Sequence, residues 1–220
     1  MIIDLIIVLF FGFCCSYPIF LLMTPQKKIK VNFFHFNLGL SIIVGSFALL
    51  INLFSSFYYS NKFDLMNDLN LGYIIIILFF SILTWYYWEK KYPVQIIVLI
   101  SILGLLFNIN NFYFDKEIIS YFDFINFISS VLGTFTLSSV VFCMILGHWY
   151  LNIPHLPVNL IKNAVKFLNL LLFSRLFFNI IIIYFTKIDS NIYGQISFID
   201  YLLSFEGIIL WLGILFGIVG

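Results

Sequence analysis

Seven long stretches of apolar residues follow one another through this chain of 220 residues. They cover residues 2–23, 33–58, 71–88, 94–112, 124–151, 160–185 and 198–220. A helix needs about 20 apolar residues to cross the hydrocarbon core of a bilayer. Each stretch is near or above that length, and none alternates as the strands of a membrane β-barrel do. The sequence therefore predicts an all-α fold, a polytopic transmembrane helix bundle of about seven spans.

The composition supports this class. Hydrophobic residues make up 63% of the chain and charged residues only 10%, whereas soluble domains have roughly 45–50% and about 25%. A water-soluble globule could not cover so much apolar surface with so few charges. The segments between the stretches are short, so we expect residues 1–220 to form a single helical membrane domain with no extramembrane domain. The expected partner is the lipid bilayer, with other membrane subunits as a further option.

Both ends of the chain bear on the number of spans. The first stretch does not resemble a cleavable signal peptide, because Asp4 stands where a positive charge is expected. The last stretch reaches Gly220 with no charged or aromatic anchor behind it. Two expectations stay open there: a seventh helix that ends at the membrane surface, and a seventh span that is truncated.

Positive charges in short loops predict the orientation of the bundle. Seven lysines lie in or next to the first, third and fifth loops, and three lie in the second, fourth and sixth. The first group is Lys27, Lys28, Lys30, Lys90, Lys91, Lys162 and Lys166, and the second is Lys62, Lys116 and Lys187. We therefore expect an inner (cell) membrane protein with its N-terminus outside and its odd-numbered loops in the cytoplasm.

Two ionisable residues stand out by their depth inside the predicted spans. By the rise of about 1.5 Å per residue, Arg175 lies roughly 15 Å deep in the sixth span and Glu206 roughly 12 Å deep in the seventh. Each costs about 2.5–3.5 kcal/mol if it faces lipid. Gly213 and Gly217 share the face of Glu206 and permit close helix contact. The sequence predicts that Arg175 and Glu206 form a buried ion pair, or a site for a substrate or proton.

The histidines suggest a second candidate site. His35, His148 and His155 are all predicted at the cytoplasmic ends of spans. Histidines from facing helices hold haem in helix bundles, which makes His35 and His148 candidate ligands of haem b, or neighbours of a quinone. Interfacial His, Trp and Tyr are also ordinary residues of the membrane boundary. His155 lies between two prolines and is the weakest candidate.

Other chemistry finds little support. The three cysteines, Cys14, Cys15 and Cys143, form no CxxC pattern, so we expect buried thiols and no metal site. There is no P-loop and no other nucleotide or hydrolase motif. A net charge of +1 gives no field that would attract nucleic acid. We expect neither nucleotide nor nucleic acid as a partner.

Three functions remain open at this point. The first is a redox or proton-handling membrane subunit that uses His35, His148 and the Arg175–Glu206 pair. The second is a secondary transporter or permease that binds a polar substrate or ion at Arg175 and Glu206. The third is a structural or assembly subunit of a membrane complex. The sequence leaves open whether the chain is an enzyme.

Overall fold

The computed structural model describes most of the chain up to residue 197. The described residues are 2–25, 29, 31–60, 68–87, 93–113, 121–152, 157–185, 187–190 and 194–197, with 200, 203, 204 and 208 singly. The elements are α1 (Ile2–Ser16), η1 (Tyr17–Met23), α2 (Val31–Ser60), α3 (Asp68–Tyr86), α4 (Val94–Tyr113), α5 (Tyr121–Asn152), α6 (Val158–Phe185), β1 (Lys187–Ser190) and β2 (Gly194–Ser197).

Four of these helices are long and apolar enough to cross a membrane: Ile6–Met23, Val31–Tyr58, Phe127–Leu151 and Val158–Ile181. Two further apolar segments, Asn70–Tyr86 and Val94–Asn108, are shorter. The described part of the chain thus has the helices of an integral membrane protein, and four candidate spans rather than seven. Most of the predicted seventh stretch, residues 198–220, lies outside the described residues.

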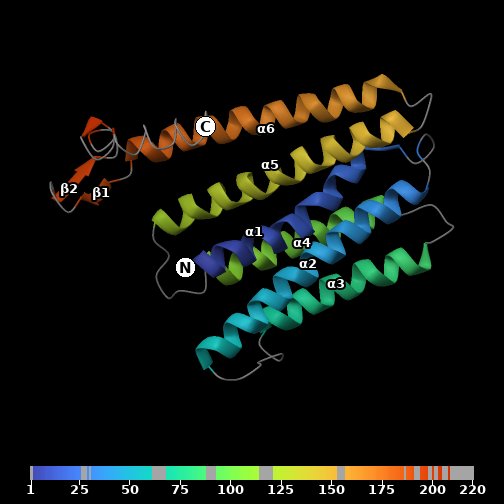
Figure 1. Cartoon of the computed structure of the whole chain (residues 1–220), viewed down its shortest axis with the longest axis horizontal. Coiled ribbons are helices and arrows are strands. Elements are labelled where there is room, and N and C mark those ends of the chain that lie inside the picture. The colour runs from blue at the N-terminus through green and yellow to red at the C-terminus, as the bar shows by residue number, and fades with distance from the viewer. Residues whose placement is uncertain are drawn as a thin grey trace. The chain divides into compact units, whose positions relative to one another are not determined.

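The chain divides into two compact units, Met1–Leu172 and Phe173–Gly220. In the first unit, α1 packs against α2, α4 and α5, and α3 packs against α2 and α4 (Figure 1). The first membrane-length segment is 67% buried, against 22% for the segment in α2 and 11% for the one in α6. The first helix is therefore the interior helix of this unit.

Prolines set several helix boundaries. Pro93 and Pro157 precede α4 and α6, and their carbonyls accept hydrogen bonds from Ile96 (3.0 Å) and Leu160 (3.0 Å). Proline suits a helix start because the first amide groups of a helix need no partner within it. Inside the first helix, Pro18 has the opposite effect, since it removes an amide donor and ends the α-helical bonding.

The second unit contains a short antiparallel hairpin that the all-α prediction did not include. β1 pairs with β2 in the register Lys187↔Ser197, Ile188↔Ile196, Asp189↔Gln195 and Ser190↔Gly194. The two strands form a two-stranded antiparallel sheet. The fold is otherwise helical where it is described.

Candidate functional site

The most unusual feature of the interior helix is its change of type. α1 ends at Ser16, and η1 continues from Tyr17 to Met23 as a 3₁₀ helix with Pro18 near its start. At about 1.5 Å per α residue and about 2.0 Å per 3₁₀ residue, Ile6–Met23 spans about 30 Å, the thickness of a hydrocarbon core. The change of helix type lies near the middle of that length. We call it the α1–η1 junction.

Ser16 links the junction to α5. Its hydroxyl donates to the carbonyl oxygen of Thr134 (3.3 Å) and lies 2.5 Å from the hydroxyl oxygen of Ser138. Ser16 and Ser138 are completely buried. Buried hydroxyls with partners on another helix fix how the two helices face each other.

Tyr17 links the same junction to α2. Its hydroxyl donates to the side-chain oxygen of Asn37, and the side-chain nitrogen of Asn37 donates to the Phe33 carbonyl (2.5 Å). Ser41 donates to the Asn37 carbonyl (3.2 Å). The Tyr17 ring also meets Phe142 of α5 edge-on, with ring centroids 6.2 Å apart. Consecutive residues of the interior helix thus bind two different neighbours.

A second tyrosine–asparagine contact lies elsewhere in the bundle. The Tyr73 hydroxyl of α3 donates to the side-chain oxygen of Asn108 in α4 (3.1 Å), and the Asn108 nitrogen donates to the Val8 carbonyl of α1 (3.3 Å). Asn52 of α2 donates to Asn70 of α3 (2.8 Å). Sequence alone does not separate these asparagines from the many others in the chain, because only their partners on other helices distinguish them.

Small residues allow the interior helix to approach its neighbours closely. A Cβ atom added at Gly45 of α2 would lie 2.6 Å from the Cys14 sulfur, and one added at Gly104 of α4 would lie 2.7 Å from the Cys15 sulfur. Cys14 and Cys15 are buried, as predicted, and Cys143 is half-buried. Each thiol of the adjacent pair therefore fills the space left by a glycine on a different helix.

The structure places the two candidate haem ligands in different surroundings. His35 of α2 is half-buried and interacts with the backbone of Tyr87, at the end of α3. Phe33 precedes His35 by two residues and lies about 200° from it around α2. The Phe33 ring contacts Trp149 of α5, with ring centroids 5.4 Å apart. His148 of α5 is exposed. The pairing of His35 and His148 around a cofactor remains a prediction, and His155 lies outside the described residues.

Arg175 is an exposed residue of α6 in the second unit, and Glu206 lies outside the described residues, as do Gly213 and Gly217. Arg175 follows Leu171 by four residues and Ala164 by eleven, so the helical repeat puts all three on one face of α6. Ala164 and Leu171 are buried. The predicted ion pair with Glu206 remains a prediction.

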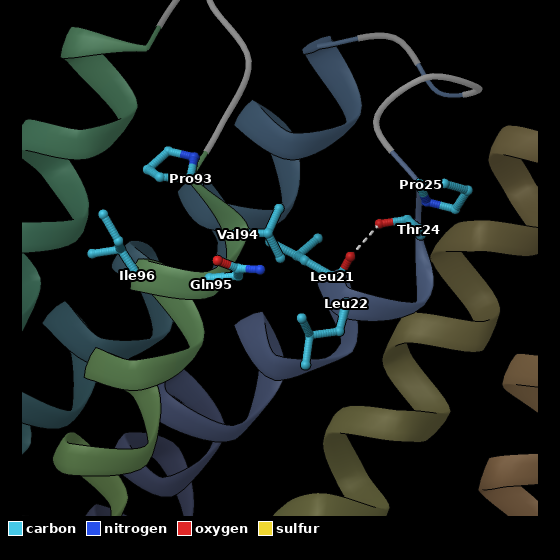
Figure 2. A pocket seen from close by; sticks show the side chains of 8 residues that line it. All are labelled: Leu21, Leu22, Thr24, Pro25, Pro93, Val94, Gln95 and Ile96. Carbon is cyan, nitrogen blue, oxygen red and sulfur yellow. Dashed lines mark hydrogen bonds between the residues drawn. The ribbon is translucent and has the colours of Figure 1, made fainter.

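Two hollows of about 470 Å³ each lie at the surface of the first unit. One opens between the end of η1 and the start of α4, with Leu22 on the η1 side and Val94 on the α4 side (Figure 2). On the η1 side the Thr24 hydroxyl donates to the Leu21 carbonyl at 2.7 Å. The other is an apolar groove between α3 and α4. Among the described residues, no group of three or more His, Cys, Asp or Glu side chains could hold a metal ion.

Comparisons with protein families, with curated proteins and with solved structures find no match to this chain. Its own geometry is therefore the basis for assigning a function. That geometry defines a class, a helical protein with membrane-length apolar helices around an interior helix that is tied to its neighbours by buried polar side chains.

Proposed function

We propose that the chain is a multi-pass protein of an inner (cell) membrane and that residues 1–220 form one membrane domain of about seven spans. The supporting observation is the interior helix, because its length of about 30 Å matches a hydrocarbon core and its neighbours in α2 and α5 have membrane-length segments. The lysine distribution supports an N-terminus outside and odd-numbered loops in the cytoplasm.

Cysteine labelling in intact cells tests this topology. A membrane-impermeant thiol reagent should label Lys62→Cys and should leave Lys28→Cys unlabelled until the membrane is permeabilised. The wild-type chain is the control for its own thiols, because Cys14 and Cys15 are buried but Cys143 is only half-buried. Labelling of Lys28→Cys from outside would reverse the orientation, and release of the chain by alkaline carbonate would contradict membrane insertion.

For the role of the protein in the membrane, we propose a structural or assembly subunit of a membrane complex. One observation carries this proposal: the interior Tyr and Asn side chains bond to one another or to backbone carbonyls, including Tyr17 to Asn37 and Tyr73 to Asn108. Polar groups used in this way specify helix packing. In a mild detergent extract, such a subunit should migrate with other proteins on a native gel, and migration as a lone chain would contradict the proposal.

A second candidate is transport of a proton or small cation, and the α1–η1 junction favours it. Transporters build ion sites where a membrane helix is interrupted, and hard cations prefer oxygen ligands. Ser16, Ser138 and the Thr134 carbonyl bring three oxygens together at this interruption. A transporter would conduct an ion flux, whereas a structural subunit would not, so ion flux is the measurement that separates the two roles.

Proteoliposomes with an internal pH-sensitive or sodium-sensitive dye separate the two roles. The double variant Ser16→Ala/Ser138→Ala removes both hydroxyls together, which leaves neither without a partner and should preserve the fold. Transport predicts flux that this variant loses. Ser46→Ala is the control, because among the described residues the Ser46 hydroxyl bonds only the Ile42 carbonyl of its own helix (2.8 Å). Absence of flux in the wild type would contradict the transport role.

The Arg175–Glu206 pair has its own test. Removing one partner of a buried pair is expected to cost more than removing both, because a single buried charge lacks compensation. Arg175→Met should therefore destabilise the protein, and adding Glu206→Gln should recover part of the loss. If the double variant is no more stable than Arg175→Met, the two residues are not paired. Recovery of stability without recovery of function would assign the pair to a substrate or proton site.

The redox alternative rests on His35 and His148 as haem b ligands or quinone neighbours. The visible absorption spectrum of the purified protein tests the haem form directly. A Soret band that both His35→Ala and His148→Ala abolish would support it, and a spectrum without that band would contradict it.

A further inference from the structure

The first half of α6 carries a stripe of long polar side chains, which we call the α6 polar stripe. It consists of Asn159, Lys162, Asn163, Lys166 and Asn169, all of them exposed. At about 100° per residue these five positions fall within about 120° of the helix circumference. The stripe ends at Asn169, since the same face continues in the sequence as Leu170, Phe173 and Phe177.

The opposite side of this half of α6 packs against the rest of its unit. Ala164 and Leu171 are buried, and the Phe167 ring meets the Phe20 ring of η1 with centroids 5.7 Å apart. Ile161 lies against Gly147 of α5. The α6 polar stripe is therefore turned away from these contacts, toward the surroundings of the unit.

The direction of the helix decides where the lysine side chains reach. Every Cα–Cβ bond of an α-helix is tilted toward the helix N-terminus. α6 begins at Val158, so Lys162 and Lys166 lean back toward the membrane surface at that end. Their positions are about 6 Å and about 12 Å along the helix. Lysine stems extend along apolar surface and deliver the ammonium group to the boundary, so both charges can reach the same headgroup layer.

A phospholipid has the same division of polarity as this face of α6. Its phosphate would meet the two ammonium groups and the asparagine amides, and its acyl chains would begin beside Leu170, where the stripe ends. A second protein helix fits less well, because the face changes from cationic to purely apolar after Asn169. We propose that the α6 polar stripe is a binding site for an anionic phospholipid, with Lys162 and Lys166 as its phosphate ligands.

This inference rests on the proposed membrane location. The test uses the full-length protein purified in detergent, with phosphatidylglycerol or phosphatidylcholine added, and counts bound lipids by native mass spectrometry. Wild type should bind phosphatidylglycerol at least tenfold more tightly than phosphatidylcholine. Lys162→Gln/Lys166→Gln removes the electrostatic attraction of two lysines for the anionic lipid. This double variant should therefore weaken phosphatidylglycerol binding by about 30-fold.

The control is Lys62→Gln/Lys116→Gln, which removes the same charge from two other loops and should bind as wild type does. Lys162→Arg/Lys166→Arg should retain binding. Equal affinity of the wild type for both lipids would overturn the inference without any variant, and so would equal losses in the test and control variants. Carbonate extraction keeps the two proposals distinct: a chain that stays in the membrane but shows no lipid preference refutes the lipid site alone.

Discussion

Gly45 and Cys14 provide a quantitative test of the packing around the interior helix. A Cβ atom at position 45 would lie 2.6 Å from the Cys14 sulfur and 3.3 Å from both Cys14 Cβ and Ile77 Cγ1. Cys14 is completely buried and has one short side-chain torsion, so it cannot move away easily. Overpacking of this kind costs about 1–3 kcal/mol. The helix-propensity gain of about 1 kcal/mol offsets part of this cost, so Gly45→Ala should lower the free energy of unfolding by up to about 2 kcal/mol.

Gly39 is a matched control on the same helix. A Cβ atom there would meet nothing within 4 Å, so Gly39→Ala should be neutral or stabilising by up to about 1 kcal/mol through helix propensity. For a chain of this size about 1 kcal/mol shifts the melting temperature by about 2–4 °C. Thermal unfolding in detergent, followed by tryptophan fluorescence, should thus separate the Gly45→Ala and Gly39→Ala variants by several degrees.

The cause can be isolated by removing the sulfur. Cys14→Ala alone should cost stability through lost packing, but the combination Gly45→Ala/Cys14→Ala should lose less than the sum of the single changes. Contacting residues typically couple by about 0.5–3 kcal/mol in such cycles. Two results would refute the reasoning: equal melting temperatures for Gly45→Ala and Gly39→Ala, or strictly additive effects in the double variant.

Three further predictions use the same unfolding assay. Asn108→Leu removes the acceptor of the Tyr73 hydroxyl and should lower the free energy of unfolding by about 0.6–1.7 kcal/mol. Adding Tyr73→Phe should recover part of this loss, and fully additive losses would contradict the hydrogen bond. Gly12→Ala would overlap the Thr134 methyl group and should cost about 1–3 kcal/mol; Thr134→Ser removes that methyl and should restore stability, whereas an unchanged loss would contradict the overlap. Ser16→Ala should lower the free energy of unfolding less than Gly12→Ala does. The reverse order would show that the hydrogen bonds of the Ser16 hydroxyl outweigh the contact between position 12 and Thr134.

The sequence predicted the helices better than their contacts. The stretch 124–151 corresponds closely to α5, Tyr121–Asn152, because the length and hydropathy of a stretch are local properties. The burial of Cys14 and Cys15 also followed from local sequence. The seven-span count is not confirmed, since four helices reach membrane length in the described part of the chain.

The contacts between helices could not be read in the same way. The stretch 2–23 was predicted as one span without the change of helix type at Pro18, and nothing in the sequence says that the adjacent Ser16 and Tyr17 bind α5 and α2. Asn37 and Asn108 look like any other asparagine in an apolar stretch, because a hydrogen-bond partner on a distant segment leaves no periodic pattern. The candidate site at the α1–η1 junction therefore emerges only from the tertiary structure.

The central position of the first helix has a consequence for synthesis. The hydroxyl partner of Ser16 lies 122 residues further along the chain, and the Asn108 side chain that bonds Val8 lies 100 residues further. At about 5–20 residues per second, the ribosome needs about 6 to 24 s to extend the chain from Ser16 to Ser138. For that interval the interior helix has polar groups in the bilayer without their final partners. We therefore expect the nascent chain to remain beside the insertion machinery until α5 has been made, and the first helix to be the last to settle into place.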